Sequence, residues 1–195
     1  MKIGTLKAEA GNATIEATAG KLGVTTLHAK KHAALTSGGA MEVTEATVGT
    51  LAAGSTAGSV NAGTLTAKTG DASVTAKKDV KIGTLKAEAG NATVKATEGK
   101  LDVTTLNAKE HAALTSGGAM TLESASADTL TANAGTTLDA TKIHTTGDAG
   151  LASGSDMVLH EAKASGKLTA DAGGSISVKG TDAKISGCLL YTSPS

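Results

Sequence analysis

The sequence predicts an all-β fold, a parallel β-solenoid of about nine coils with about 20 residues in each coil. Three observations support this prediction. The stretch Lys2–Met41 returns almost unchanged as Lys81–Met120, with only six substitutions between the two copies. A recurring leucine divides this long repeat into shorter units, and apolar residues alternate with polar ones inside each unit, which is the period of a β-strand. Short units of this size are typical of solenoid coils, each of which is ordered by stacking on its neighbours.

The marker leucine gives the expected coil length. The markers are Leu6, Leu27, Leu51, Leu65, Leu85, Leu106 and Leu130, followed less regularly by Leu151 and Leu168. Leu85 is the counterpart of Leu6 in the second copy, so four intervals between markers make up the long repeat. The interval from Leu51 to Leu65 is clearly the shortest, which predicts that a strand or corner is missing within residues 46–62. The register of residues 46–62 and 140–165 stays open at this point.

Residues 83–103 show the elements expected within one coil. Leu85 and Ala87 are predicted to face inward, followed by a Gly-Asn turn. A second strand follows, with Ala92, Val94 and Ala96 facing inward and Thr93, Lys95 and Thr97 facing outward. After a turn at residues 98–100, Leu101 and Val103 form a third apolar pair. We therefore expect three short strands and three corners per coil, with glycine and asparagine at corners.

The composition fits a thin core and excludes several functions. The chain has no Phe, Trp or Arg and has 25 Gly, so the core must be built from Leu, Val, Ile and Ala. Eighteen basic residues balance 18 acidic ones, which leaves no excess of positive charge for nucleic acid or an anionic membrane. No apolar run is long enough for a membrane span, and no signal peptide opens the chain.

Residues 1–187 are predicted to form a single solenoid segment that contains the duplication 2–41/81–120. Met1 takes the place that Val80 has in the second copy, so the chain is expected to begin inside a repeat and to be a fragment of a longer protein. Residues 188–195 (CLLYTSPS) hold the only Cys, Tyr and Pro of the chain. They resemble the translation of a sequencing-library adapter, and we expect this tail to be non-native.

The repeat pattern resembles that of filamentous haemagglutinin-type exoproteins, the large adhesins of bacterial two-partner secretion. Residues 63–67 (GTLTA), 70–76 (GDASVTA) and 79–82 (DVKI) follow the family's run of short apolar alternations separated by glycine turns. Residues 172–178 (AGGSISV) are the phrase closest to the family. The resemblance covers residues 2–187 and is one of pattern and composition. The family's secretion domain and effector regions have no counterpart here.

This resemblance implies a right-handed parallel β-helix on the outer surface of a Gram-negative cell or secreted from it. It implies a structural shaft of an adhesin, which displays binding regions away from the cell. The implied partners belong to the parent protein: a receptor or glycan on a host or neighbouring cell, and an outer-membrane transporter barrel. Binding of nucleic acid and insertion into a membrane are not expected.

No catalytic, cofactor or metal site is predicted, and we expect the chain not to be an enzyme. The sequence has no Walker loop, no Rossmann fingerprint and no nucleophile motif. The histidines are His28, His32, His111, His144 and His160. His28 becomes Asn107 in the second copy, which argues against a metal ligand. His32 and His111 recur in the same phrase and are expected to occupy corners. The glycines at 38–39 and 117–118 lack the aspartate of calcium-binding β-rolls and are interpreted as turns.

Three alternatives remain open from the residues alone. The threonines before the marker leucines (Thr5, Thr26, Thr50, Thr64, Thr84, Thr105 and Thr129) could form an outward ladder, as on ice-binding solenoids. The neighbouring column is not uniform, which argues against a flat hydroxyl array. A low-complexity stress protein that stays disordered is the second alternative. Third, Asn12 and Asn91 stand in glycosylation sequons, although a corner asparagine explains both.

Overall fold

The computed structural model describes residues 1–179 and 184–192, with side chains described as far as Lys179, and every described element is a β-strand. The strands are β1 (Lys2–Ala8), β2 (Ala13–Ala17), β3 (Leu22–Ser37), β4 (Met41–Ser55), β5 (Val60–Ala67), β6 (Ala72–Ala76), β7 (Val80–Ala87), β8 (Ala92–Ala96), β9 (Leu101–Ala108), β10 (His111–Ser116), β11 (Met120–Ala127), β12 (Thr129–Ala134), β13 (Leu138–Thr145), β14 (Ala149–Ser153), β15 (Met157–Ala172), β16 (Ile176–Val178) and β17 (Lys184–Thr192). All pairings between them are parallel. The predicted all-β solenoid is confirmed.

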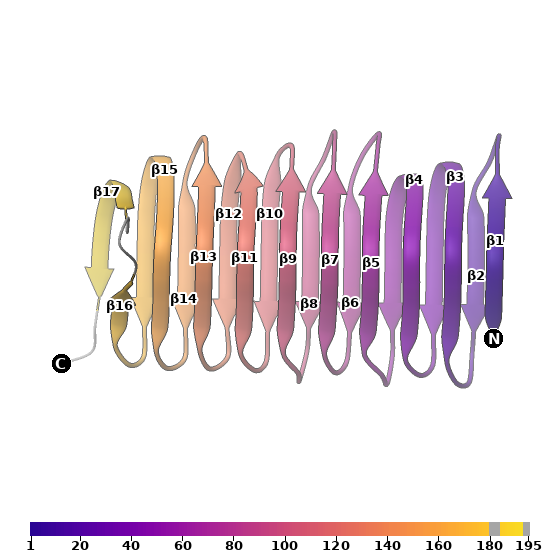
Figure 1. Cartoon of the computed structure of the whole chain (residues 1–195), viewed down its shortest axis with the longest axis horizontal. Coiled ribbons are helices and arrows are strands. Elements are labelled where there is room, and N and C mark those ends of the chain that lie inside the picture. The colour runs from indigo at the N-terminus through magenta and orange to yellow at the C-terminus, as the bar shows by residue number, and fades with distance from the viewer. Residues whose placement is uncertain (180–183, 193–195) are drawn as a thin grey trace.

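Each coil contains a long strand segment and a short one. They form one continuous strand in β3, β4 and β15, and two strands elsewhere: β1 with β2, β5 with β6, β7 with β8, β9 with β10, β11 with β12 and β13 with β14. We number these coils 1 to 9 in chain order; β16 and β17 follow and pair with β15. In Figure 1 the long segments run upward on the near side and the short ones downward on the far side, while the chain advances from right to left. The coils are therefore right-handed, the usual hand for connections between parallel strands.

The register between coils corrects the leucine markers. Leu6, Leu27, Leu65, Leu85 and Leu106 do stack in one column. The place expected for Leu51 is taken by Ala46, and that expected for Leu130 is taken by Ala125. Leu51 and Leu130 are instead the first inward residues of short segments. They pair with Ala72 and Ala149, and Ala149 pairs with Leu168 as well. The markers were wrong there because alanine and leucine both occupy inward positions.

The corrected register removes the irregularity expected within residues 46–62. One column near the start of the long segments contains Lys2, Gly23, Glu42, Asn61 and Lys81. These positions are almost evenly spaced, and the four coils that they bound make up the long repeat, since Lys81 is the counterpart of Lys2. No strand or corner is missing, and the prediction of a gap was wrong. Residues 140–165 stack in the same way, through Ile143 on Ala162.

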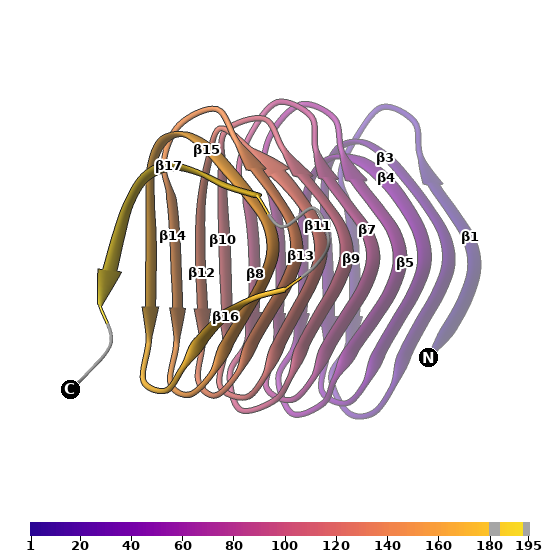
Figure 2. The same cartoon turned by 60° about the vertical axis from the view of Figure 1, so that its left-hand side comes forward.

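The cross-section has three apolar faces, as expected, but two strands instead of three. In coil 5, Val80 with Ile82 and Leu85 with Ala87 lie in the single strand β7. Two consecutive residues, Gly83 and Thr84, point away from the core between these pairs, and the register skips Gly83. The long strand therefore bends there without ending, which gives the curved outline in Figure 2. The expectation of a separate third strand was wrong, because a bend needs no turn residues.

The core consists of small and medium aliphatic side chains stacked in columns. Val74, Val94 and Leu114 form one such column, and each side chain is at most 1% exposed. Their polar neighbours along the short segments, Thr75 and Lys95, are exposed on the opposite side. The inward and outward assignment predicted for this coil is confirmed. Stacking at about 4.8 Å per coil gives nine coils a length of roughly 40 Å.

Polar side chains at the corners bind the backbone of the next coil. The Asn12 carbonyl oxygen accepts from the His32 amide at 3.2 Å, and the His32 ring contacts the Thr50 hydroxyl at 2.7 Å. The second copy repeats both contacts through His111, with Asn91 at 3.1 Å and Thr129 at 2.8 Å. The predicted corner role of His32 and His111 is confirmed. Within the described residues, no buried side-chain nitrogen or oxygen lacks a partner.

The end of the chain lies partly outside the described residues. The solenoid predicted for residues 1–187 is described without residues 180–183, and β17 places residues 188–192 of the suggested non-native tail beside β15. Residues 193–195 lie outside the described part. That residues 188–195 are non-native stays a prediction.

Candidate functional site

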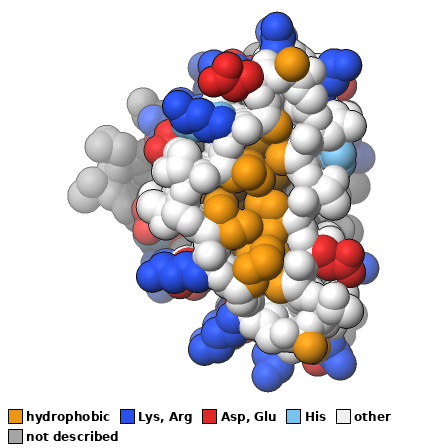
Figure 3. Space-filling model, turned by 90° about the vertical axis from the view of Figure 1, so that its right-hand side faces the viewer, with side chains coloured by type: hydrophobic (Ala, Val, Ile, Leu, Met, Phe, Trp, Pro, Cys, Tyr) orange, Lys and Arg blue, Asp and Glu red, His pale blue; other side chains and the backbone are white. Residues whose placement is uncertain are grey.

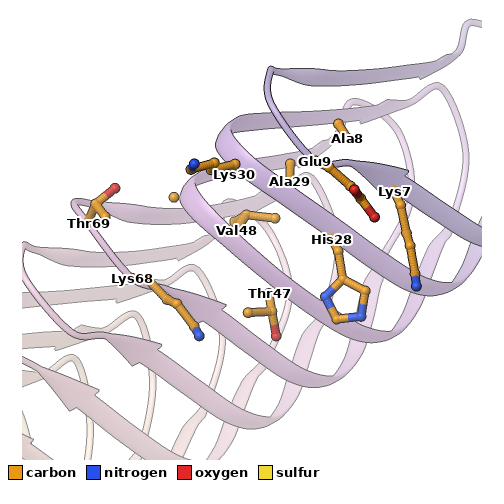
Figure 4. A pocket seen from close by; sticks show the side chains of 11 residues that line it. Lys7, Ala8, Glu9, His28, Ala29, Lys30, Thr47, Val48, Lys68 and Thr69 are labelled. Atoms are coloured by element: carbon orange, nitrogen blue, oxygen red, sulfur yellow. The ribbon is translucent and has the colours of Figure 1, made fainter.

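A groove of about 440 Å³ crosses coils 1 to 4 at the corner between long and short segments. It is lined by Lys7, Ala8, Glu9, His28, Ala29, Lys30, Thr47, Val48, Gly49, Lys68 and Thr69. Figure 4 shows Lys7, His28 and Thr47 projecting from successive strands along one side, with Lys68 further along the stack. This groove is the strongest candidate for ligand contact.

The groove exists because corners of different length are stacked on one another. The corner between the inward residues of the two segments comprises residues 9–12 in coil 1, 30–32 in coil 2, 49–50 in coil 3 and 68–71 in coil 4. The short corner of coil 3 therefore lies between longer ones. Gly49 suits this position, since a Cβ there would lie 2.5 Å from the carbonyl oxygen of Lys31.

The charged groups of the groove are mainly basic. Lys7, Lys30 and Lys68 are exposed at its rim, opposed by the carboxylate of Glu9. His28 and Thr47 are half-buried in its wall and offer an imidazole and a hydroxyl. With His28 neutral, the lining carries two net positive charges, and it holds no buried carboxylate that could act as a general acid or base. The arrangement can bind an anion by charge and hydrogen bonds, and it has no nucleophile with a partnered base.

The second copy has a smaller equivalent of about 250 Å³, lined by Lys86, Ala87, Glu88, Asn107, Ala108 and Lys109. Its net positive charge is smaller, because only two lysines oppose Glu88, and Asn107 takes the place of the His28 imidazole. Nearby, Glu110 replaces Lys31, and Asp128 stands where coil 3 has Gly49. Two of the six substitutions between the copies, His28 to Asn107 and Lys31 to Glu110, therefore lie at or near this corner, and the first groove is the more basic one.

The histidines are not brought together by the fold. His28 and His144 lie in the same outward column but six coils apart, whereas His32 and His111 bind threonines at corners. His160 lies 3.7 Å from the carboxylate of Asp139 in the preceding coil. Among residues 1–179, no three His, Cys, Asp or Glu side chains are grouped as metal ligands would be. The part of the chain that is described also contains no helix able to cross a bilayer.

The expected threonine ladder is wrong at two positions. Thr50 and Thr129 lie at corners against His32 and His111, and their places in the column belong to Glu45 and Ser124. The observed column is Thr5, Thr26, Glu45, Thr64, Thr84, Thr105, Ser124, Lys142 and Glu161. Charged residues therefore interrupt the hydroxyl array that an ice-binding face would need.

The groove was not found from the sequence, because it depends on the relative lengths of stacked corners. A signal was present in Lys30 and Lys68, which directly follow the last inward alanine of the long segment in two units, Ala29 and Ala67. Comparisons of the chain with protein-family models, with curated proteins and with solved structures find no match.

Proposed function

We propose that this chain is a shaft segment of a secreted bacterial surface adhesin, a rigid spacer that holds binding regions away from the cell. Two observations support the proposal. The repeats resemble those of filamentous haemagglutinin-type exoproteins, and the observed fold is a β-solenoid, which is compatible with a structural repeat protein. A parallel stack with one continuous core resists bending, because each coil is hydrogen-bonded to the coils on both sides.

The observation that carries the proposal is the continuous register across the duplication. Coil 5 stacks on coil 4 through Val80, Ile82, Leu85 and Ala87, although it repeats the sequence of coil 1. The duplication therefore adds four coils to the length and leaves the cross-section unchanged. Selection that tolerates such lengthening is expected for a spacer.

The test is a deletion of residues 42–120, which removes one period of the long repeat. The new junction, Met41 to Thr121, repeats the natural sequence at Met120 and Thr121. We expect a folded rod whose maximum dimension in small-angle X-ray scattering is shorter by about 19 Å, four spacings of about 4.8 Å. A matched deletion of residues 42–110 joins Met41 to His111 and puts a short-segment sequence where a long segment belongs. It should lose the cooperative unfolding transition.

If the in-register deletion unfolds the chain as the mismatched deletion does, the solenoid does not tolerate a change in the number of coils, and the spacer proposal fails. The secretion part of the proposal has a separate test in the surrounding gene. A secretion domain encoded upstream, with a transporter barrel gene beside it, is the expected finding. A reading frame that encodes a cytosolic enzyme around these repeats would contradict it.

We also propose that the groove over coils 1 to 4 contacts an acidic glycan. Its three lysines, imidazole and hydroxyl match a chain of sulfate or carboxylate groups better than a neutral sugar. Because these lysines are exposed, the interaction should weaken strongly as salt increases. A purely mechanical shaft would not need basic charge concentrated in one of two otherwise similar grooves.

The experiment is a titration with a sulfated polysaccharide, using the triple variant Lys7→Gln, Lys30→Gln and Lys68→Gln. We expect binding by the unchanged chain at low salt and at least a tenfold loss in this variant. The control changes Lys81, Lys95 and Lys100 to Gln, which alters the net charge equally outside the groove. Equal losses in both variants would show non-specific attraction and would refute this second proposal.

A further inference from the structure

Coil 1 leaves one end of the core uncovered. Figure 3 looks onto this end and shows an apolar strip surrounded by polar and charged side chains. Ile3, Leu6 and Ala8 are partly exposed there, whereas their equivalents in coil 5, Ile82, Leu85 and Ala87, are at most 1% exposed. We call the surface formed by β1 and β2 the end face.

The chain itself shows what covers this type of face. In coil 5, which repeats the sequence of coil 1, the same surface is covered by coil 4, residues 60–79. Leu65 stacks on Leu85, Ala67 on Ala87 and Val74 on Val94. The backbone of coil 5 donates hydrogen bonds to coil 4 from Glu88 at 2.8 Å, Thr97 at 2.9 Å and Glu98 at 2.9 Å. The matching amides of coil 1 belong to Glu9, Thr18 and Ala19, and they face the open end of the stack.

We propose that the end face is an interaction surface for a parallel β-coil with the inward residues of coil 4. A coil of this type supplies a leucine opposite Leu6 and alanines opposite Ala8 and Ala13, as Leu65, Ala67 and Ala72 do in coil 4. It must also supply carbonyl groups for the three open amides. Polar residues at its corners complete the fit, as Asp71 does by accepting from the amide of Asn91 at 2.8 Å.

The differences between the two faces preserve this fit. Within β1 and β2, Ile15 replaces Val94, which keeps an aliphatic side chain in the column, and Glu16 replaces the outward Lys95. At the following corner, Ala19 replaces Glu98, whose carboxylate lies 3.7 Å from the Lys77 ammonium. The end face therefore loses one exposed ion pair with a coil-4-type partner and keeps the apolar and backbone contacts. Exposed pairs of this kind contribute little.

The test extends the full chain with residues 60–80 placed before Lys2, so that the junction repeats Val80–Lys81. Amide hydrogen exchange is measured at Glu9, Thr18 and Ala19. We expect at least tenfold slower exchange at these amides than in the unextended chain. The control carries the same extension with Leu65→Asp and Val74→Asp in the added coil only, and it should leave the exchange rates unchanged.

Two results would overturn the proposal. The first is unchanged exchange with the unmodified extension, which would mean that the end face does not accept this coil. The second is equal protection by both extensions, which would mean that the apolar columns do not select the occupant. Both results leave the spacer proposal intact, since that proposal rests on the register across the duplication and is tested by the lengths of the deletion variants.

Discussion

Val94→Asp tests the inward assignment of the apolar columns. Val94 is fully buried between Val74 and Leu114, so the substitution removes about 1.5–3 kcal/mol of apolar burial. The new carboxyl group would contact only aliphatic side chains in its column. Burial of a polar group without a partner costs roughly a further 2 kcal/mol or more. We expect a loss of at least about 3.5 kcal/mol, a large part of the 5–15 kcal/mol typical of a domain.

The matched control is Lys95→Glu, one residue along the same strand. Lys95 is exposed, and the first copy already has Glu16 at this position. We expect a change within about 0.5 kcal/mol, as for most surface substitutions. Val94→Ala, with an expected cost of about 2 kcal/mol from two lost carbons and a small cavity, keeps the test informative if the aspartate variant does not fold.

The assay is urea-induced unfolding of all three variants, followed by far-ultraviolet circular dichroism. The free energy of unfolding should fall in the order Lys95→Glu, Val94→Ala, Val94→Asp. Equal losses for Val94→Asp and Lys95→Glu would refute the inward and outward assignment. A spectrum without β-structure in the unchanged chain would instead support the disordered alternative.

Three further predictions concern the corners. Gly154→Ala should lower the free energy of unfolding in urea by about 1–3 kcal/mol, because its Cβ would meet the carbonyl oxygen of Gly135. The control Gly150→Ala places a Cβ with no atom closer than 4.0 Å and should not destabilise the chain. Similar losses in both variants would contradict the close approach at Gly154. The amide and hydroxyl of Ser175 donate to the Asp156 carboxylate and hold the pKa of Asp156 below its ordinary value. The stability advantage of the unchanged chain over Asp156→Asn should therefore be complete above the ordinary aspartate pKa and should be lost as pH falls through the lowered pKa. A stability difference that does not depend on pH would contradict this prediction. Asn91→Ala should cost about 1–2 kcal/mol in the same assay, because Asn91 bonds both Asp71 and the amide of His111, while Asn107→Ala on an exposed strand face should be nearly neutral.

The sequence predicted the type of fold because apolar and polar residues alternate along most of each coil, apart from the corners and the bend in the long segment. Ala92, Val94 and Ala96 face inward as expected, and the Gly-Asn corners lie where they were placed. The register was harder to predict, because an inward site accepts either alanine or leucine. Ala46 and Ala125 therefore gave no signal, and Leu51 and Leu130 gave a misleading one.

The candidate site could not be predicted for a related reason. The groove arises because residues 49–50 form a short corner between the longer corners of coils 2 and 4. Corner lengths become comparable only once each coil is aligned with its neighbours. The same alignment moved Thr50 and Thr129 out of the threonine column and showed them as partners of His32 and His111.

The most direct test of the central claim is a distance between Lys7 and Lys163, which lie in one outward column eight coils apart. Spin labels on cysteines at these positions, with Cys188→Ser to leave no other thiol, allow measurement by pulsed electron paramagnetic resonance. A single stack with about 4.8 Å per coil predicts a narrow distribution centred at about 38 Å. A broad distribution, or a narrow one at a clearly different distance, would contradict the solenoid shaft.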